Sequence, residues 1–415
     1  MALNEKIAVE LATVNPINGE YIYADLLLPA SPMEIEDAMQ RARLTENYGD
    51  YCDVNIISCP YLRKLEDTRI DGKIHLKELN LFAKRVTVLS EDELLAMEGI
   101  FTNQQEKGKY ADGVSVEELI NLTYGLSAVP VIHGIYSDEM IGEFVIENEL
   151  NEELLGLSDD ALKFVDKNSV GKEHREMEGG RFVNGNYVAT AVYSFPKEYK
   201  GATAEQLEVH NTIAFALKVA EAPVNDSQET EENAEWIYLP LDKNEANRVA
   251  RLHNEGCIED CVYIGFESAF DGIDGTVFGD MQDFDKLNKI AEKYVSLSET
   301  DRVKFKAVIG HIEPATLDKI QEAVDHLQQY EFAYYDIYAE DFAKDYLKHH
   351  LPTNFDSEFL DDIPLARLGD KLLDRLNATV TGYGVLSDRG RSLYEIVPYR
   401  ETEQEQKEEM GGMSM

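Results

Sequence analysis

One pattern of residues occurs twice along this 415-residue chain, in the same order both times. The pairs that share one spacing of 208 positions are Leu79-Asn80 with Leu287-Asn288, Ala83 with Ala291, and Leu89-Ser90-Glu91 with Leu297-Ser298-Glu299. Collinear matches at nearby spacings join Leu28-Pro29 to Leu239-Pro240, Ser115 to Leu126 with Thr316 to Leu327, and Ile135 to Glu139 with Ile337 to Asp341. Repetition at this length indicates two structural units of one kind. We therefore expect an internally duplicated chain of two modules.

Local patterns within each module mix helix and strand. Ser90 to Glu93 and Ser115 to Glu118 fit capping boxes, which begin helices, and Ser298 to Asp301 repeats the first of them. Helical apolar spacing occurs at Leu119, Leu122 and Leu126 and again at Ile320, Val324 and Leu327. Strands are predicted at Tyr21-Ile22-Tyr23, Val54 to Ile57, Val129 to Ile132 and Val262-Tyr263-Ile264. The predicted fold class is α+β, with several small mixed α/β units.

Composition divides the chain into four parts. We expect a first module over residues 1–200 and a second, diverged module over 236–400. Between them, residues 201–235 are predicted to be an acidic linker region, because Ala222 to Glu235 is polar and has no apolar period. The charged residues 401–415 are predicted to form a disordered tail.

Negative charge dominates the whole chain. Asp and Glu number 80 against 39 Lys and Arg, a formal net charge of -41 at pH 7, yet 44% of the residues are hydrophobic, so the chain can build cores. No lysine or arginine lies between Lys109 and Lys163, where twelve carboxylates occur, and Leu252 to Asp285 is a second such window with nine. Folded surfaces normally mix both signs. This charge repels nucleic acid and anionic membranes and attracts basic surfaces. A solvated acidic face remains the plain alternative to a binding surface.

Other classes of protein find little support in the sequence. Four cysteines are too few for a disulfide framework, no apolar run approaches the ~20 residues of a membrane span, and the N-terminus has no signal-peptide pattern. We expect a cytoplasmic protein. Glycine-rich phosphate loops, nucleophile elbows and paired-histidine zinc helices are missing, so we expect neither an enzyme nor a cofactor.

Three segments suggest a metal only weakly. Asp271 to Asp285 is rich in Asp and Gly, but Ile273 and Gly275 stand where calcium ligands are needed. Cys257 and Cys261 lack further ligands at zinc spacing, so we expect both to be buried as small apolar residues. His349-His350 is predicted to end a helix. We therefore expect no metal site.

A family resemblance adds to this interpretation. The acidic run Asp138 to Leu150, Val170-Gly171, the turn Gly179-Gly180-Arg181-Phe182 and Tyr187-Val188 resemble the ArdA antirestriction proteins. Leu76 to Asp92 and Val116 to Leu126 are similar to the larger variants of this family from mobile genetic elements. The resemblance covers residues 20–190 and extends more weakly, through the repeat, over 236–395. It implies an elongated, acidic, non-enzymatic mimic of bent B-form DNA.

The resemblance also implies a partner and a mechanism. It predicts occupation of the DNA-binding groove in the methyltransferase core of a type I restriction-modification enzyme, with the chain acting either as a homodimer or, through its two modules, as an intrachain pseudo-dimer. B-DNA carries one charge per ~1.7 Å, so 41 charges correspond to about 70 Å of duplex. We expect no binding of nucleic acid or membrane. Along α-helical spacing, Met140 and Phe144 are predicted to face inward while Asp138, Glu139, Glu143 and Glu147 face outward.

The candidate partner-binding residues are all carboxylates. They are Asp112, Glu117, Glu118, Asp138, Glu139, Glu143, Glu147, Glu149, Glu152, Glu153, Asp159, Asp160, Glu259, Asp260, Glu267, Asp271, Asp274, Glu340 and Asp341. Three alternatives stay open: an inhibitor of another DNA-binding defence nuclease such as a CRISPR effector, an acidic adaptor without DNA mimicry, and a carboxylate-based metal enzyme.

Overall fold

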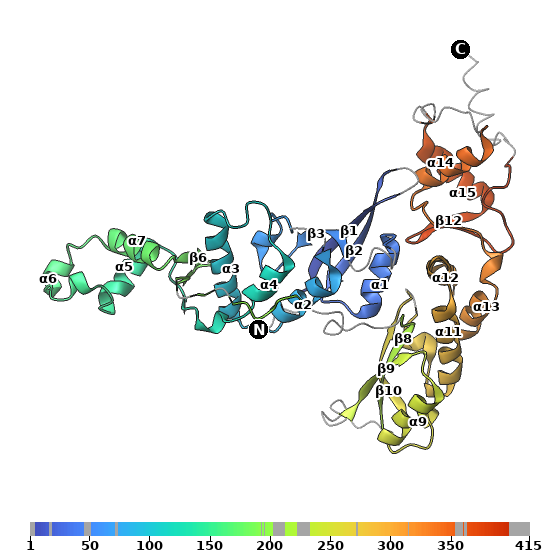
Figure 1. The fold of residues 1–415 in the computed structure, drawn as a ribbon, viewed down its shortest axis with the longest axis horizontal. Helices are drawn as coiled ribbons and strands as arrows, with labels where there is room; N and C mark the ends of the chain where they lie inside the picture. The colour runs from blue at the N-terminus through green and yellow to red at the C-terminus, as the bar shows by residue number, and fades with distance from the viewer. Residues whose placement is uncertain are drawn as a thin grey trace, which may run out of the picture. The chain divides into compact units, whose positions relative to one another are not determined.

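The chain forms two compact units, Met1–Asn211 and Thr212–Met415 (Figure 1). The computed structural model describes residues 5–15, 19–44, 51–70, 74–191, 193–194, 196–201, 212–221, 233–270, 273–313, 315–352, 360 and 363–397. Helices and small antiparallel sheets occur in both units, which confirms the predicted α+β class.

The first unit begins with an antiparallel sheet of order β2-β1-β3-β4. Its strands are β1 (Ile7–Val14), β2 (Tyr21–Leu28), β3 (Tyr51–Ser58) and β4 (Ile74–His75), and α1 (Pro32–Arg41) packs against β2. Every second residue of β2 is buried, as expected for a strand with one face on a core. The inward residues Ile22, Leu26 and Leu28 join that core.

Three helices continue this core: α2 (Leu76–Val86), α3 (Glu91–Glu106) and α4 (Val116–Leu122). The predicted capping boxes are confirmed, because Ser90 and Ser115 each exchange hydrogen bonds with the glutamate three residues on. Helix α4 ends before Leu126, which lies in the 3-10 turn η3 (Leu126–Ala128) instead. The left-handed conformation of Gly125 separates the two elements.

A second small sheet and a helical lobe complete the first unit. The sheet has the order β5-β7-β6, with β5 (Val131–Ile132), β6 (Arg181–Val183) and β7 (Asn186–Val188), and α3 contacts all three strands. Between β5 and β6 the chain forms α5 (Asp138–Glu147), the 3-10 turn η4 (Glu152–Leu154), α6 (Asp159–Leu162) and α7 (Lys167–Met177).

The second unit contains two three-stranded sheets, β10-β8-β9 and β11-β13-β12. Its strands are β8 (Phe215–Ala220), β9 (Glu235–Leu239), β10 (Val262–Ser268), β11 (Phe332–Ala333), β12 (Ala378–Thr381) and β13 (Gly384–Ser387). Its helices are α9 (Lys243–Leu252), α10 (Gly275–Phe278), α11 (Phe284–Ser296), α12 (Glu299–His311), α13 (Leu317–Asp325), α14 (Ala339–His350) and α15 (Leu365–Leu376), with 3-10 turns η5 (Ile258–Asp260), η6 (Met281–Asp283) and η7 (Leu327–Gln329).

Part of the predicted linker is folded. Strand β8 lies within residues 201–235 and is the central strand of its sheet, so that segment is not linker throughout. The short apolar run Phe215 to Ala220 is the signal for a strand buried on both faces. Residues 202–211 and 222–232 of the predicted linker, and the tail 401–415, lie outside the described residues.

Corresponding contacts occur in the two units. Asn80 Nδ2 donates to the Ala30 carbonyl at 2.8 Å and its Oδ1 accepts from Ala30 N at 2.8 Å. Asn288 makes the same pair of bonds with the backbone of Leu241, at 3.0 and 2.7 Å. Strand order also agrees, since β1 and β8 are each central between two neighbours, as are β7 and β13. Duplication as the origin of this agreement stays a prediction.

Candidate functional site

The acidic run 138–150 lies in a lobe formed by α5 and α7, whose backbones approach closely. A side chain on Gly142 would place its Cβ 1.8 Å from the Lys167 carbonyl oxygen, and one on Gly171 would place it 1.7 Å from that of Asp138. Ile141 and Val145 are buried against Tyr187 of β7, while Met140 and Phe144 are half-buried at the edge of this cluster. Helix α5 therefore has an inward face, as predicted, but its buried residues Ile141 and Val145 each follow the predicted Met140 and Phe144 by one position.

Two of the predicted outward acids of α5 are bound to cations of α7. Asp138 accepts from Arg175 Nε at 2.6 Å and from Nη2 at 3.1 Å, and Glu143 accepts from Lys167 Nζ at 2.5 Å. These hydrogen bonds raise the pKa of both basic groups above their ordinary values. The charges of Asp138 and Glu143 thus join α5 to α7. Glu143 is exposed, as predicted, whereas Asp138 is half-buried between the two helices.

The other acids of this segment are displayed. Glu139 and Glu147 of α5, Glu149 just after it, and Glu152 and Glu153 of η4 are exposed, and no ion pair is found for them within the described residues. We call these five residues the acidic surface. Asp160 is exposed but lies 2.8 Å from Lys163 Nζ, and the side chain of Asp159 is outside the described part of the chain.

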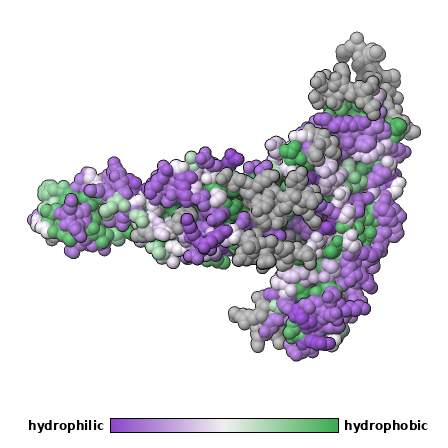
Figure 2. All heavy atoms as spheres, viewed as in Figure 1, coloured by the Kyte–Doolittle hydropathy of each residue, from purple (hydrophilic) through white to green (hydrophobic). Residues whose placement is uncertain are grey.

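Apolar side chains interrupt the acidic surface. Leu150, Leu155 and Leu157 are about half exposed, and Phe164 is 90% exposed. Figure 2 shows green, apolar atoms among purple ones at the end of the first unit where Figure 1 places α6. This feature was not predicted, although the four leucines of 150–157, on both sides of Glu152 and Glu153, were a signal for it in the sequence. Exposed apolar side chains gathered in one place are typical of protein-binding surfaces.

The remaining candidates of the first unit are dispersed. Asp112 and Glu117 are exposed. Glu118 is committed to the capping box of α4 and to Lys109, whose Nζ lies 3.1 Å from its Oε1. These residues lie outside the α5–α7 lobe, in and before α4.

Candidates in the second unit have mostly local roles. Asp274 caps α10, Asp260 accepts from the Cys257 thiol at 3.1 Å, and Glu259 is half-buried in η5. Glu267 and Glu340 are exposed, while Asp271 lies outside the described residues. Asp341 is only 8% exposed, because the packing of α14 places it among the buried residues of that helix, and this burial weighs against its predicted role in binding a partner.

Two acids of α5 correspond to lysines of α14. A Cβ on Gly369 of α15 would meet the Ala339 carbonyl oxygen at 1.9 Å, as one on Gly171 would meet that of Asp138. By this contact Asp138 corresponds to Ala339, whereas the sequence repeat had matched Asp138 with Glu340, one residue later. Glu143 and Glu147 then correspond to Lys344 and Lys348. Of the two α5 residues in the acidic surface, Glu147 therefore corresponds to a lysine, whereas Glu139 corresponds to the exposed Glu340.

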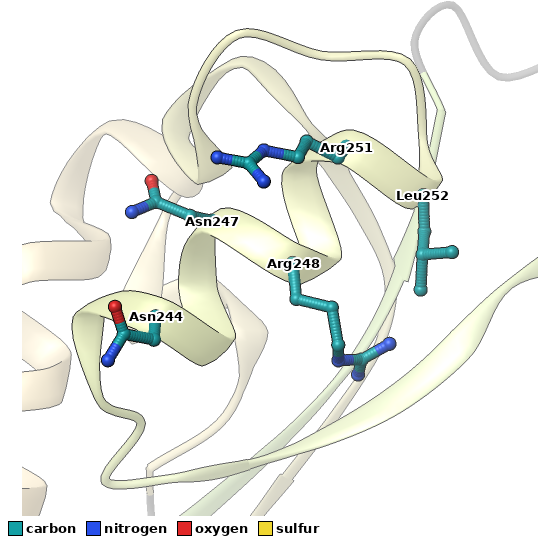
Figure 3. Close-up of a pocket in the computed structure, with 5 residues that line it drawn as sticks. All are labelled: Asn244, Asn247, Arg248, Arg251 and Leu252. Atoms are coloured by element: carbon teal, nitrogen blue, oxygen red, sulfur yellow. The ribbon is translucent and has the colours of Figure 1, made fainter.

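A hollow of about 370 Å³ lies on the exposed face of α9. Figure 3 shows the side chains that line it, Asn244, Asn247, Arg248, Arg251 and Leu252. Arg248 donates to Glu245 at 2.7 Å and to Glu235 at 3.3 Å, so its charge is already balanced within the unit. The lining contains no acid–base pair suited to catalysis.

The described residues contain neither a cluster of metal ligands nor a membrane-spanning helix. No three His, Cys, Asp or Glu side chains there are arranged to hold a metal ion. None of the described helices combines the length and apolar character that crossing a bilayer requires. Cys261 is buried, but Cys257 is half-exposed, which corrects the expectation that both are buried.

Comparison with known proteins adds no relative. No protein-family model matches the chain, and a search of curated proteins finds no match either. The α5–α7 lobe combines exposed carboxylates, adjacent apolar side chains and a tightly packed helical support.

Proposed function

We propose that this chain is a non-enzymatic DNA mimic that occupies the DNA-binding groove of a type I restriction-modification enzyme. The observation that carries the proposal is the acidic surface, five exposed carboxylates from Glu139 to Glu153 in a sequence window without lysine or arginine. The resemblance of residues 138–150 to the ArdA family supports the choice of target.

In the proposed mechanism, carboxylates take the place of DNA phosphates. A DNA-binding groove presents lysine and arginine, which form charge-assisted hydrogen bonds to carboxylates as they do to phosphates. Long-range attraction by a chain of net charge -41 speeds encounter and is weakened by salt. Leu155 and Phe164 beside the acids add apolar contact that a DNA backbone does not offer.

The rigid support of α5 favours this use of its acids. Backbone contact between α5 and α7 at Gly142 and Gly171 leaves little room for one helix to slide on the other. The Asp138–Arg175 pair joins the same two helices. Carboxylates held in place lose less conformational freedom on binding than acids on a flexible segment would.

Displacement of labelled duplex DNA from a type I methyltransferase tests the proposal. We expect the purified full chain to displace the duplex at low salt and to do so less well at high salt. A variant with all five residues of the acidic surface changed to Gln should need at least about fivefold more protein, since exposed ion pairs contribute about 0.2–1 kcal/mol each.

A matched variant controls for net charge. It neutralises five exposed acids of the second unit, Glu221, Asp285, Glu313, Asp370 and Asp374. This variant loses the same charge and should displace the duplex as the unmodified chain does. No displacement by the unmodified chain at either salt concentration contradicts the proposal, and equal loss in both variants assigns the effect to net charge alone.

A further inference from the structure

A carboxyl group is buried in the connection between β11 and α14. The side chain of Asp336 is 6% exposed, and its Oδ2 has no hydrogen-bond partner among the described residues. An ionised carboxylate in such a place is costly because burial separates it from solvent and its Oδ2 meets no donor among the described residues. Burial, followed by the negative charges of Asp345 and Asp341, raises the pKa of Asp336 to about 7, against the opposing effects of His349 and Lys348.

The charged neighbours of Asp336 come from α14 and from the end of the described chain. On α14 these are Asp341, Asp345, Lys348 and His349, and Tyr394 is the titratable group from the C-terminal side. Helix α15 and strand β13 supply apolar groups to the same core, among them Leu372, Leu373, Leu376 and Val385. Two carboxylates and two basic groups of α14 therefore act on Asp336.

Residues 392–397, which we call the strap, are hydrogen-bonded to α14 and to Glu331, the residue before β11. Leu393 N donates to Glu331 Oε2 at 2.7 Å, and the Tyr394 hydroxyl donates to Asp345 Oδ2 at 2.6 Å. Tyr346 of α14 donates to the Glu395 carbonyl at 2.8 Å and its hydroxyl accepts from Val397 N at 3.3 Å. The ring of His349 stacks on that of Tyr394 with 4.0 Å between centroids.

Asp345 joins the strap to the buried carboxyl. It anchors Tyr394, and its charge acts on Asp336. We propose that Asp336 is a proton-operated latch for the strap: its protonated form keeps the β11–α14 connection packed under α14, and loss of the proton loosens that connection together with the strap. The inference does not depend on the proposed function.

The sign of the pH dependence follows from the proton count. The closed form keeps the Asp336 proton up to about pH 7, whereas the opened form releases it near the ordinary value of 3.8. Between these values the closed form holds one more proton, so opening becomes more favourable as pH rises, by up to about tenfold per pH unit. Above pH 7 neither form holds the proton, and the dependence levels off.

Hydrogen exchange of the full chain between pH 5.5 and 8 tests the latch. The sequence isoelectric point of about 4.5 sets the lower limit, since solubility falls near it. After correction for intrinsic exchange, the opening constant at the amides of Leu393 and Val397 should rise about tenfold from pH 5.5 to 7 and then level off. Asp336→Asn should abolish this rise and be at least about tenfold better protected at pH 7.5.

Two further measurements make the result decisive. Asp370→Asn, an exposed acid on α15, should keep the unmodified pH profile. Carbon-13 NMR of the Asp336 carboxyl in the unmodified chain should give a midpoint near neutrality, whether or not the Asn variant folds. A midpoint near 4, a flat exchange profile in the unmodified chain, or an unchanged slope in Asp336→Asn would each overturn the latch.

Discussion

Arg175 and Asp138 face each other across α7 and α5 with both carboxylate oxygens engaged, Oδ1 by Nε and Oδ2 by Nη2. The two residues are 37 positions apart in the sequence and join the helices that support the acidic surface. Their side chains are only 24% and 19% exposed, so solvent screens the pair less than it screens a surface ion pair.

The Asp138–Arg175 pair should therefore contribute measurably to stability. A double-mutant cycle with Asp138→Asn and Arg175→Gln should give a coupling energy of about 1–2 kcal/mol in denaturant unfolding, as charge-assisted bidentate bonds do. Asp160 and Lys163, which are 89% and 71% exposed, are the matched control, and their coupling should stay below about 0.5 kcal/mol. Equal coupling energies in the two cycles would show that the lower exposure of the Asp138–Arg175 pair does not strengthen its contribution to stability.

Substitution of Gly171 by Ala should disrupt the lobe. The added Cβ would lie 1.7 Å from the Asp138 carbonyl oxygen, so the helices must separate, which costs at least about 2 kcal/mol. Gly310→Ala in α12 is the control, because no atom lies within 4 Å of the new Cβ and alanine favours helix by up to about 1 kcal/mol. Thermal unfolding of both variants, read beside that of the unmodified chain, distinguishes steric conflict from a general effect of the exchange.

Asn80→Ala should destabilise the first unit more than Asn288→Ala destabilises the second. Both asparagines bond twice to a backbone, but the Asn80 bonds are buried and those of Asn288 are partly open to solvent. Truncation of Asn80 leaves the Ala30 N–H and carbonyl without partners inside the protein, a loss of about 2–4 kcal/mol. Hydrogen exchange at amides of the central strands β1 and β8, which lose no bond in either variant, measures each unit separately, and the opposite ranking would contradict the argument from burial.

Single acids of the acidic surface should matter little by themselves. Glu147→Gln should change duplex displacement by about fivefold or less, since one exposed ion pair contributes about 0.2–1 kcal/mol. The effect of changing all five acids should be close to the sum of the single effects. A dominant single residue, seen in the same displacement assay, would instead indicate one specific contact in place of a distributed charge.

Sequence patterns predicted most of what is local. Ser90 and Ser115 begin helices as their capping boxes indicated, and the strand pattern at Tyr21 to Tyr23 lies within β2. Such signals depend on neighbours within a few positions. Helix α5 was also predicted, although its buried residues are Ile141 and Val145.

Long-range contacts were beyond these patterns. Periodicity does not say which cation meets which carboxylate, so the partners of Asp138 and Glu143 could not be named in advance. Asp341 looked like any other acid of a first turn, and only the packing of α14 decides that it is buried. The correspondence between α5 and α14 similarly depends on a backbone contact at Gly369. The match predicted from the sequence differs from it by one residue.

The lysines of α14 make the two units differ in charge at corresponding positions. Because Lys344 and Lys348 take the places of Glu143 and Glu147, the two units cannot make interchangeable contacts with identical basic sites. A receptor with two identical basic sites would thus find one matching unit in each polypeptide. We expect such a receptor to bind two polypeptides, whereas a chain with two identical units could fill both sites alone.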